Sequence, residues 1–221
     1  MMRIVRSAAL VVVVLWCSLP ASAQRVLPSG GAPARIVLLV DSSSAMSPML
    51  THFRAALQAF LDAVPAQHEI ALISTGGQLR IRVPPTADRE RLHKAVASFA
   101  SEGGANAFLD SLLEADTRLL KTAPTMWPVF VIVVTDAAET RGEQRIDDYN
   151  TFMNDFLARG GQAHSIVIRG KNSGIITDIA INLSQNTRGI HESLAIANAL
   201  PANLKAIASR LEADYLPHLT R

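Results

Sequence analysis

Two aspartates in this sequence follow runs of apolar, mostly aliphatic residues. Asp41 comes directly after the run 36–40, and Asp136 follows the run 129–134 after one threonine. A third segment, Gly-Gly-Ala-Asn at 103–106, combines a turn signal with an amide side chain. Carboxylate, hydroxyl and amide oxygens are the ligands that hard divalent cations prefer. If the fold brings the three segments together, they offer a site for such a cation.

The two apolar runs predict the elements that must position these oxygens. Runs of this kind are typical of strands buried on both faces of a sheet. Segments with helical apolar spacing separate the strands, and this alternation predicts parallel βαβ units in a doubly wound α/β sheet. In such sheets ligands bind where loops leave the carboxyl ends of the strands. We therefore expect 36–40 and 129–134 to be adjacent at the centre of the sheet, with Asp41 and Asp136 at one edge.

The same periodicities predict the remaining elements. A helix is expected after the first loop, with Ser47 as its N-cap and Pro48 at its first position. Residues 78–83 alternate after a Gly-Gly turn, which favours an antiparallel edge strand. Further strands are expected at 70–73, at 163–168 and near Ile190. Further helices are expected at 87–99, 106–120, 146–157, 176–183 and 202–211.

The residues at the loop ends resemble those of the von Willebrand factor A (VWA) family. Its metal-ion-dependent adhesion site uses Asp-x-Ser-x-Ser, a threonine after a glycine-rich turn, and an aspartate after the fourth strand. Asp41 and Ser43 match the first two positions, Asn106 falls about where the threonine belongs, and Asp136 in Val-Val-Thr-Asp matches the last. The resemblance covers roughly residues 35–211 and is closest to bacterial exported members.

The resemblance implies a Rossmann-like sheet and a protein-binding function without catalysis. It implies Mg²⁺ or Mn²⁺ held by Asp41, Ser43, Asn106 and Asp136, with an acidic group of a partner protein as the last ligand. Ala45 departs from the pattern, because it has no oxygen where the second serine belongs. Since Mg²⁺ tolerates retained waters, water could take that position, with lower affinity for the cation.

A metal-free interpretation of the same residues stays open. Asp41 and Asp136 could hydrogen-bond loop backbone and cap helices, which makes the chain a VWA scaffold within an envelope assembly. An exported α/β hydrolase is a third class of function. Its nucleophile elbow, Gly-x-Ser-x-Gly, is missing around Ser43, and His164 lies inside an apolar run. Trp127 could pack over the start of the fourth strand or could serve as a binding residue.

Two other kinds of site lack their signature in the sequence. The glycine pair at 103–104 is not followed by Lys-Ser or Lys-Thr, which argues against a phosphate-binding loop. The six histidines include no pair at i, i+4 spacing, which argues against zinc. Glu139, three residues after Asp136, is expected to be a solvated loop acid.

The N-terminal residues predict export. Arg3 and Arg6 precede an apolar run at 8–19, and Ala-Ser-Ala at 21–23 fits a signal-peptidase site. We expect residues 1–23 to be a signal peptide, 24–34 a flexible leader and 35–221 one VWA-like domain. The apolar run is shorter than the roughly 20 residues that a membrane-spanning helix needs. Membrane attachment is therefore expected only if the signal stays uncleaved.

Charge and cysteine content narrow the location and the partner. The single cysteine, Cys17, lies in the expected signal, so the exported chain would contain no disulfide. Two of the 21 basic residues also lie there, which leaves 19 against 19 acidic residues. A neutral chain has no electrostatic support for binding nucleic acid. We expect a bacterial protein of the periplasm or the cell exterior whose partner is another protein.

Overall fold

The computed structural model describes residues 32–137, 145–170 and 174–215. Within them six strands form one sheet in the order β3-β2-β1-β4-β5-β6. Neighbouring strands pair in parallel except β2 and β3, which are antiparallel. The strands are β1 (Ala34–Val40), β2 (Glu69–Ser74), β3 (Arg80–Thr86), β4 (Trp127–Thr135), β5 (Gln162–Ile168) and β6 (His191–Leu194). The predicted doubly wound, mainly parallel α/β sheet is confirmed.

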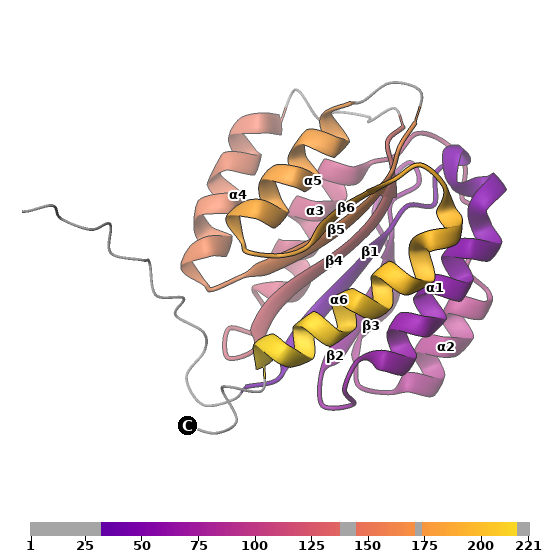
Figure 1. Cartoon of the computed structure of the whole chain (residues 1–221). Coiled ribbons are helices and arrows are strands. Elements are labelled where there is room, and N and C mark those ends of the chain that lie inside the picture. Colours follow the sequence, from indigo (N-terminus) through magenta and orange to yellow (C-terminus); the bar gives the residue numbers. More distant parts are fainter. Residues whose placement is uncertain (1–31, 138–144, 171–173, 216–221) are drawn as a thin grey trace, which may run out of the picture.

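Helices cover both faces of this sheet (Figure 1). One hydrophobic cluster joins α1, α2 and α6 to one face, and a second cluster joins α3, α4 and α5 to the other. The α-helices are α1 (Leu50–Ala63), α2 (Arg89–Ala97), α3 (Phe108–Ala115), α4 (Ile146–Ala158), α5 (Ile175–Asn186) and α6 (Leu200–Tyr215). Shorter helical turns are η1 (Ser44–Met49), η2 (Asp116–Leu120) and η4 (Ala197–Ala199).

The central position of β1 and β4 is also confirmed. The two strands pair in parallel, with Val40 opposite Val133. Side chains of β1 alternate between the two faces: Leu38 packs in the cluster of α1 and α6, and Leu39 in the cluster of α3 and α4. Both residues are fully buried. A strand covered on both faces needs apolar residues at every position, which explains the unbroken run in the sequence.

Strand β3 is the antiparallel edge strand that the sequence predicted. It runs from Arg80 to Thr86, three residues later than expected at its end. Its register against β2 shifts between the pairs Ile70–Thr86 and Leu72–Val83, so that β3 has one more residue than β2 in this interval. Pro84 and Pro85 occupy the shift, and proline in a sheet is confined to edges and bulges because it has no N–H donor.

The predicted start of the first helix is wrong. Ser47 does not cap it, because the preceding residues form the 3₁₀ turn η1, which contains Pro48. The α-helix begins at Leu50. Proline fixes φ in a range that suits a 3₁₀ turn as well as a first α-helical turn, so the sequence signal does not separate the two.

Several other helix boundaries differ from the expected ones; α5 and α6, for example, are both longer than predicted. Helix α2 begins at Arg89, because the Asp88 carboxylate caps it by accepting the Arg91 N–H at 3.0 Å. The segment predicted as one helix at 106–120 starts two residues later and continues from α3 into the π-helical turn η2.

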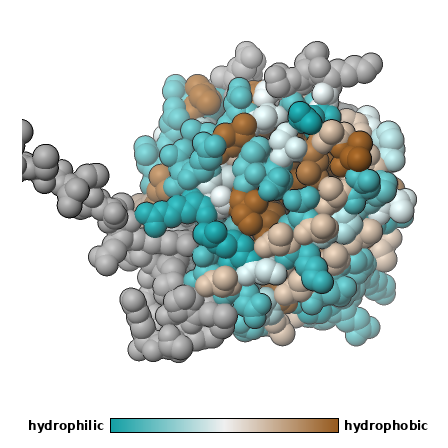
Figure 2. Space-filling model, in the orientation of Figure 1, coloured by the Kyte–Doolittle hydropathy of each residue, from teal (hydrophilic) through white to brown (hydrophobic). Residues whose placement is uncertain are grey.

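On the face shown in Figure 2, hydrophobic side chains form separate spots among polar ones. Among the described residues, the exposed large hydrophobic side chains are Ile146, Leu157 and Ile196. None of the helices in the described ranges has the length and apolar character that crossing a membrane requires. The expected signal at 1–23 and Glu139 lie outside the described residues.

Candidate functional site

The carboxyl ends of the parallel strands bring the predicted loops to one edge of the sheet. Asp41 follows β1, and its backbone N–H donates to the Val133 carbonyl of β4 at 2.9 Å. Thr75 follows β2, and its N–H donates to the Val40 carbonyl at 3.2 Å. Asp136 follows β4, and its N–H donates to the Ile168 carbonyl of β5 at 2.8 Å. The sheet ladder therefore continues into the loops and fixes where their side chains begin.

The carboxylate of Asp41 is buried and surrounded by hydrogen-bond donors. Asp41 has no exposed surface. Oδ1 accepts the backbone N–H of Ser43 at 2.7 Å, and Oδ2 accepts the backbone N–H of Thr135 at 3.0 Å and the Thr135 hydroxyl. Among the described residues no Lys, Arg or His side chain forms an ion pair with it. Its negative charge is thus met by neutral donors alone.

Ser43 lies next in this loop with an unsatisfied hydroxyl. Its residue is 1% exposed, and its Oγ has no hydrogen-bond partner. Ser101 holds the backbone of this loop, because its hydroxyl lies 3.0 Å from the Ser43 carbonyl oxygen and 3.2 Å from the Ser42 carbonyl oxygen. Buried hydroxyls are normally hydrogen-bonded, so the unpaired Ser43 hydroxyl is a position where an ion or a water molecule could bind.

Asn106 is brought to the same edge through Thr75. It is fully buried, and its Oδ1 accepts the Thr75 hydroxyl at 2.6 Å. Its Nδ2 has no hydrogen-bond partner. Turning the amide over would exchange the two atoms: Nδ2 would then donate to the Thr75 hydroxyl and Oδ1 would face the unsatisfied position.

Asp136 follows Thr135, which hydrogen-bonds the Asp41 carboxylate, but the Asp136 side chain faces the start of α5. It is 6% exposed, and its Oδ1 accepts the backbone N–H of Gly174, the residue that precedes α5, at 3.0 Å. Asp41 accepts in the same way from Ser43, which precedes η1, so each aspartate binds the backbone N–H of a residue that precedes a helix. Within the described ranges, no hydrogen bond joins the side chains of Asp41, Ser43, Asn106 and Asp136 directly to one another.

The donor set fits a hard divalent cation in part. The Asp41 charge, the unpaired Ser43 hydroxyl and the invertible Asn106 amide are oxygen ligands of the kind that Mg²⁺ and Mn²⁺ take. Ala45 is exposed and supplies no oxygen. No cluster of three or more His, Cys, Asp or Glu side chains suited to a metal occurs in the described part of the chain. Any cation here would therefore depend on hydroxyl, amide and water oxygens beside two carboxylates.

Glu102 is a residue of this edge that the sequence reasoning missed. Its Oε2 accepts the hydroxyls of Ser42 at 2.8 Å and Ser74 at 2.7 Å. Its Oε1 lies 2.8 Å from Arg80 Nε and 3.1 Å from Arg82. The hydrogen bonds from the serines and the charges of the arginines lower the pKa of Glu102 although burial opposes them. The available signal was an acidic residue directly before the Gly-Gly pair.

A groove with a volume of about 710 Å³ lies beside the loops. It starts at Gly77 and Ala107, which adjoin the Asn106 loop, and extends along α3 to Arg118. Arg145 lines it as well and forms an ion pair with Asp110 at 2.6 Å. Asp41, Ser43, Asn106 and Asp136 do not line this groove themselves.

The other residues singled out from the sequence belong to the structural core. Trp127 is 2% exposed as the first residue of β4, which favours its packing role over a binding role. His164 is fully buried in β5, and its Nδ1 accepts the Ile190 N–H at 3.1 Å. Neither side chain is placed at the candidate site.

Comparison with known proteins finds one matching domain model and several similar folds. Residues 36–139 match the model of the von Willebrand factor type A domain. Among solved structures, a von Willebrand factor type A protein from Catenulispora acidiphila is similar with a TM-score of 0.66 and 16% identity, over 80% of this chain and 42% of that chain. This chain thus spans less than half of that relative's length. No curated protein sequence matches the chain.

Two further structures share the fold. The vWF domain of the type V pili tip protein Mfa5 from Porphyromonas gingivalis is similar with a TM-score of 0.64 and 12% identity, over 83% of this chain and 96% of that chain. The manganese-loaded TRAP protein of Plasmodium vivax is similar with a TM-score of 0.57 and 13% identity, over 80% of this chain and 74% of that chain. At these identities the similarity shows the fold alone.

Proposed function

We propose that this chain is a member of the von Willebrand factor type A family, whose domain model residues 36–139 match, and that it is an exported, non-enzymatic protein-binding module. In this proposal a divalent cation at the Asp41 edge assists recognition of an acidic group on the partner. Domains of this family generally act as binding modules without catalysis. The location that we propose, the bacterial periplasm or the cell exterior, rests on the signal-like residues 1–23.

One observation carries the cation part of the proposal. Ser43 has a buried hydroxyl without a hydrogen-bond partner, and it lies two residues from a buried aspartate whose carboxylate faces no cationic side chain in the described residues. A buried charge without a counter-charge and a buried polar atom without a partner both cost free energy. A cation bound between them would remove both costs. The manganese-loaded relative supports the choice of Mg²⁺ or Mn²⁺.

The residues would take separate parts in this site. Asp41 would supply the main negative charge and Ser43 a hydroxyl ligand. Asn106 would supply its amide oxygen after the turn described above, and Asp136 would assist from β4. A bound cation would supply the positive charge that attracts a carboxylate of the partner. Ala45 leaves one ligand position to water, so we expect weaker binding than an Asp-x-Ser-x-Ser loop provides.

A metal-free scaffold is the second candidate function, and a specific observation favours it. The Asp41 carboxylate already accepts two backbone N–H groups and one hydroxyl. Hydrogen bonds to an ionised acceptor are roughly twice as strong as bonds between neutral groups. The loop could therefore keep its shape without a cation and present its rim to a partner within an envelope assembly.

Thermal melts of three proteins distinguish the two candidates. The wild type should melt at a higher temperature in millimolar Mg²⁺ or Mn²⁺ than in chelator, because a ligand of the folded state stabilises it by about 2.7 kcal/mol at 100 times its Kd. Asp41→Ala should abolish the difference, and Ala45→Ser should enlarge it by restoring a hydroxyl. Identical melting of the wild type and Ala45→Ser in both conditions would show that the cation part is wrong.

The partner can be sought with the same variants. The exported chain, from residue 24 onward, is immobilised and exposed to envelope extract with Mg²⁺ or with chelator. A protein that is retained by the wild type in Mg²⁺, and lost with Asp41→Ala or with chelator, is expected. Retention that is equal in all conditions would favour the metal-free scaffold.

A further inference from the structure

The carboxylate of Glu102 occupies the centre of the contacts that hold the Asp41 loop. Its side chain is only 11% exposed although it lies in a loop. The Ser42 hydroxyl that it binds belongs to the residue between Asp41 and Ser43. The Ser74 hydroxyl belongs to the last residue of β2. One carboxylate oxygen therefore links the end of β2 to the loop that follows β1.

The other carboxylate oxygen links this point to the edge strand. Arg80 and Arg82 of β3 lie 2.8 and 3.1 Å from Oε1. Arg82 also donates to the Ser74 hydroxyl at 3.0 Å, and its guanidinium lies over the Phe99 ring. Two guanidinium groups that converge on one point repel each other unless a negative charge lies between them. The Glu102 carboxylate accepts both serine hydroxyls through Oε2, while its charge lies between the two arginines at Oε1, which has no hydrogen-bond partner.

Backbone hydrogen bonds extend the same connection to the Asn106 loop. The Glu102 N–H donates to the Ser42 carbonyl at 2.7 Å, and the Ser44 N–H donates to the Gly104 carbonyl at 3.1 Å. The Gly76 N–H donates to the Ser42 hydroxyl at 2.8 Å. A Cβ on Gly76 would come within 2.6 Å of the Ser42 carbonyl oxygen, so the two loops approach as closely as a glycine allows.

We infer that Glu102 is the positioning residue of the candidate site: bound to Ser42, Ser74, Arg80 and Arg82, it fixes the Asp41–Ser43 turn and the Asn106 loop in one arrangement before any ligand binds. That this arrangement serves ligand binding rests on the proposed function, whereas the contacts that form it all lie within the protein. It gives this chain a means of keeping the loop ordered although Ala45 removes one cation ligand. Preorganised groups bind with a smaller ordering cost.

Amide hydrogen exchange in chelator tests the inference with Glu102→Gln. The variant keeps the size of the side chain but removes the charge between Arg80 and Arg82. We expect at least tenfold faster exchange at the amides of Ser44, Gly76 and Gly77, which donate within the connected loops. The central β1 amides should exchange as in the wild type, because Glu102 lies outside the core.

Two further variants control the measurement. Glu69→Gln removes a carboxylate that also pairs with an arginine, Arg35 at 2.7 Å, but at the opposite edge of the sheet. Its loop amides should exchange as in the wild type. Arg80→Gln removes one of the two guanidinium partners, and its loop amides should be accelerated less than those of Glu102→Gln. Unchanged loop exchange in Glu102→Gln, or equal acceleration of the loop and of β1, would overturn the inference.

A Mn²⁺ titration followed by water-proton relaxation gives a readout that general destabilisation would not move. Glu102→Gln should need about tenfold more Mn²⁺ than the wild type, whereas Glu69→Gln should not. Faster loop exchange with unchanged Mn²⁺ affinity would overturn the positioning role. If the wild type itself takes up no Mn²⁺, the cation part of the proposed function fails, and the exchange data alone decide whether Glu102 orders the loops.

Discussion

Asp41 lies at the carboxyl ends of the parallel strands and Asp116 near their amino ends. The two residues are equally buried, at 0% and 1% exposure. Asp116, in η2, is held by Arg159, whose guanidinium donates to both carboxylate oxygens at 2.7 and 2.9 Å. Lys121 lies 3.7 Å from the same carboxylate. Asp41 has backbone N–H groups and one hydroxyl in place of these cations. The two aspartates thus receive different kinds of compensation for the same burial.

The difference separates a carboxylate paired with cationic side chains from one that is held by neutral donors alone. Burial raises the pKa of Asp116 even though Arg159 and Lys121 lower it, so its ionised form is costly despite the pairing. Its surroundings are nevertheless complete, because two cationic side chains surround it. Asp41 has no cationic side chain paired with it among the described residues. Equal burial in one sheet therefore does not imply an equal role.

Removing the partner of Asp116 should have the largest effect. Arg159→Ala leaves the buried carboxylate without its guanidinium, and we expect a loss of about 4 kcal/mol in the free energy of unfolding. The measurement is urea denaturation at neutral pH. Arg118→Ala is the control, since it breaks an exposed pair with Glu114, and it should cost less than about 1 kcal/mol. Similar losses in both variants would contradict the structural role of Asp116.

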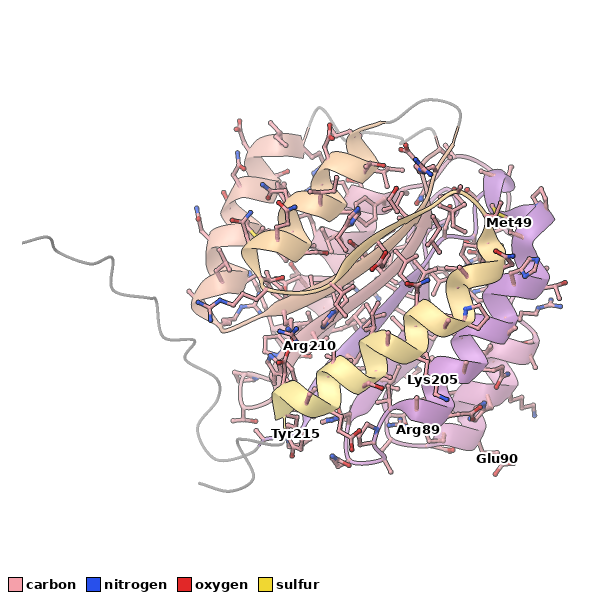
Figure 3. The ribbon with its side chains drawn as sticks, viewed as in Figure 1. Met49, Arg89, Glu90, Lys205, Arg210 and Tyr215 are labelled. Carbon is pink, nitrogen blue, oxygen red and sulfur yellow. The ribbon has the colours of Figure 1, made fainter. Side chains whose placement is uncertain are left out.

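Acidification should lower the free energy of unfolding by an intermediate amount, because it protonates His68, which lies at the same end of the sheet as Asp116. His68 is fully buried, and burial and then the charge of Arg89 lower its pKa from 6.5 to about 4. Its ring packs edge-to-face on Tyr215, and Figure 3 shows Arg89 and Tyr215 at the same end of the molecule. The unfolded chain takes up the proton first, so the stability from neutral His68 is lost as the pH falls from about 6.5 to 4.

The pH dependence is measured by urea denaturation of the wild type and His68→Gln at pH 7 and pH 4. The wild type should lose up to about 3 kcal/mol more than the variant between these values. The raised pKa of Asp116 acts in the opposite direction, because its folded form binds the proton more tightly, and it contributes equally in both proteins. Equal losses in the two proteins would mean that His68 keeps an ordinary pKa in the fold.

The smallest effect is expected at the Asp41 edge. Thr135→Val keeps the shape of a buried strand residue but removes the hydroxyl that donates to Asp41. We expect a loss of about 2 kcal/mol in chelator, the range for a hydrogen bond to a charged group. Thr117→Val, on the exposed surface of η2, is the control and should change little. No loss in Thr135→Val would show that the backbone N–H groups suffice to hold the Asp41 carboxylate.

The sequence predicted the fold well because its strands are buried on both faces. Only an unbroken apolar run can occupy such a position, so the runs before Asp41 and Asp136 revealed the two central strands directly. The edge strand was also predicted, from alternation after a glycine turn. The start of the first helix was not, because Pro48 fits a 3₁₀ turn as well as an α-helix.

The candidate site was predicted less completely, because its contacts join distant parts of the chain. The positions of Asp41 and Asp136 at the sheet edge follow from the strands that precede them. The Thr75 hydroxyl on Asn106 and the Gly174 N–H on Asp136 depend on pairings over 31 and 38 residues. Glu102 binds side chains from three other segments, and no local pattern indicates which hydroxyls or arginines will surround it.

The prolines of β3 have a consequence for how the molecule behaves at high concentration. An exposed edge strand is a template on which another chain can add a strand, and such addition leads to aggregation. Pro84 and Pro85 have no N–H groups, and the register shift beside them interrupts the regular ladder. At the other edge, β6 is only four residues long. Both edge strands are therefore poor starting points for fibril growth.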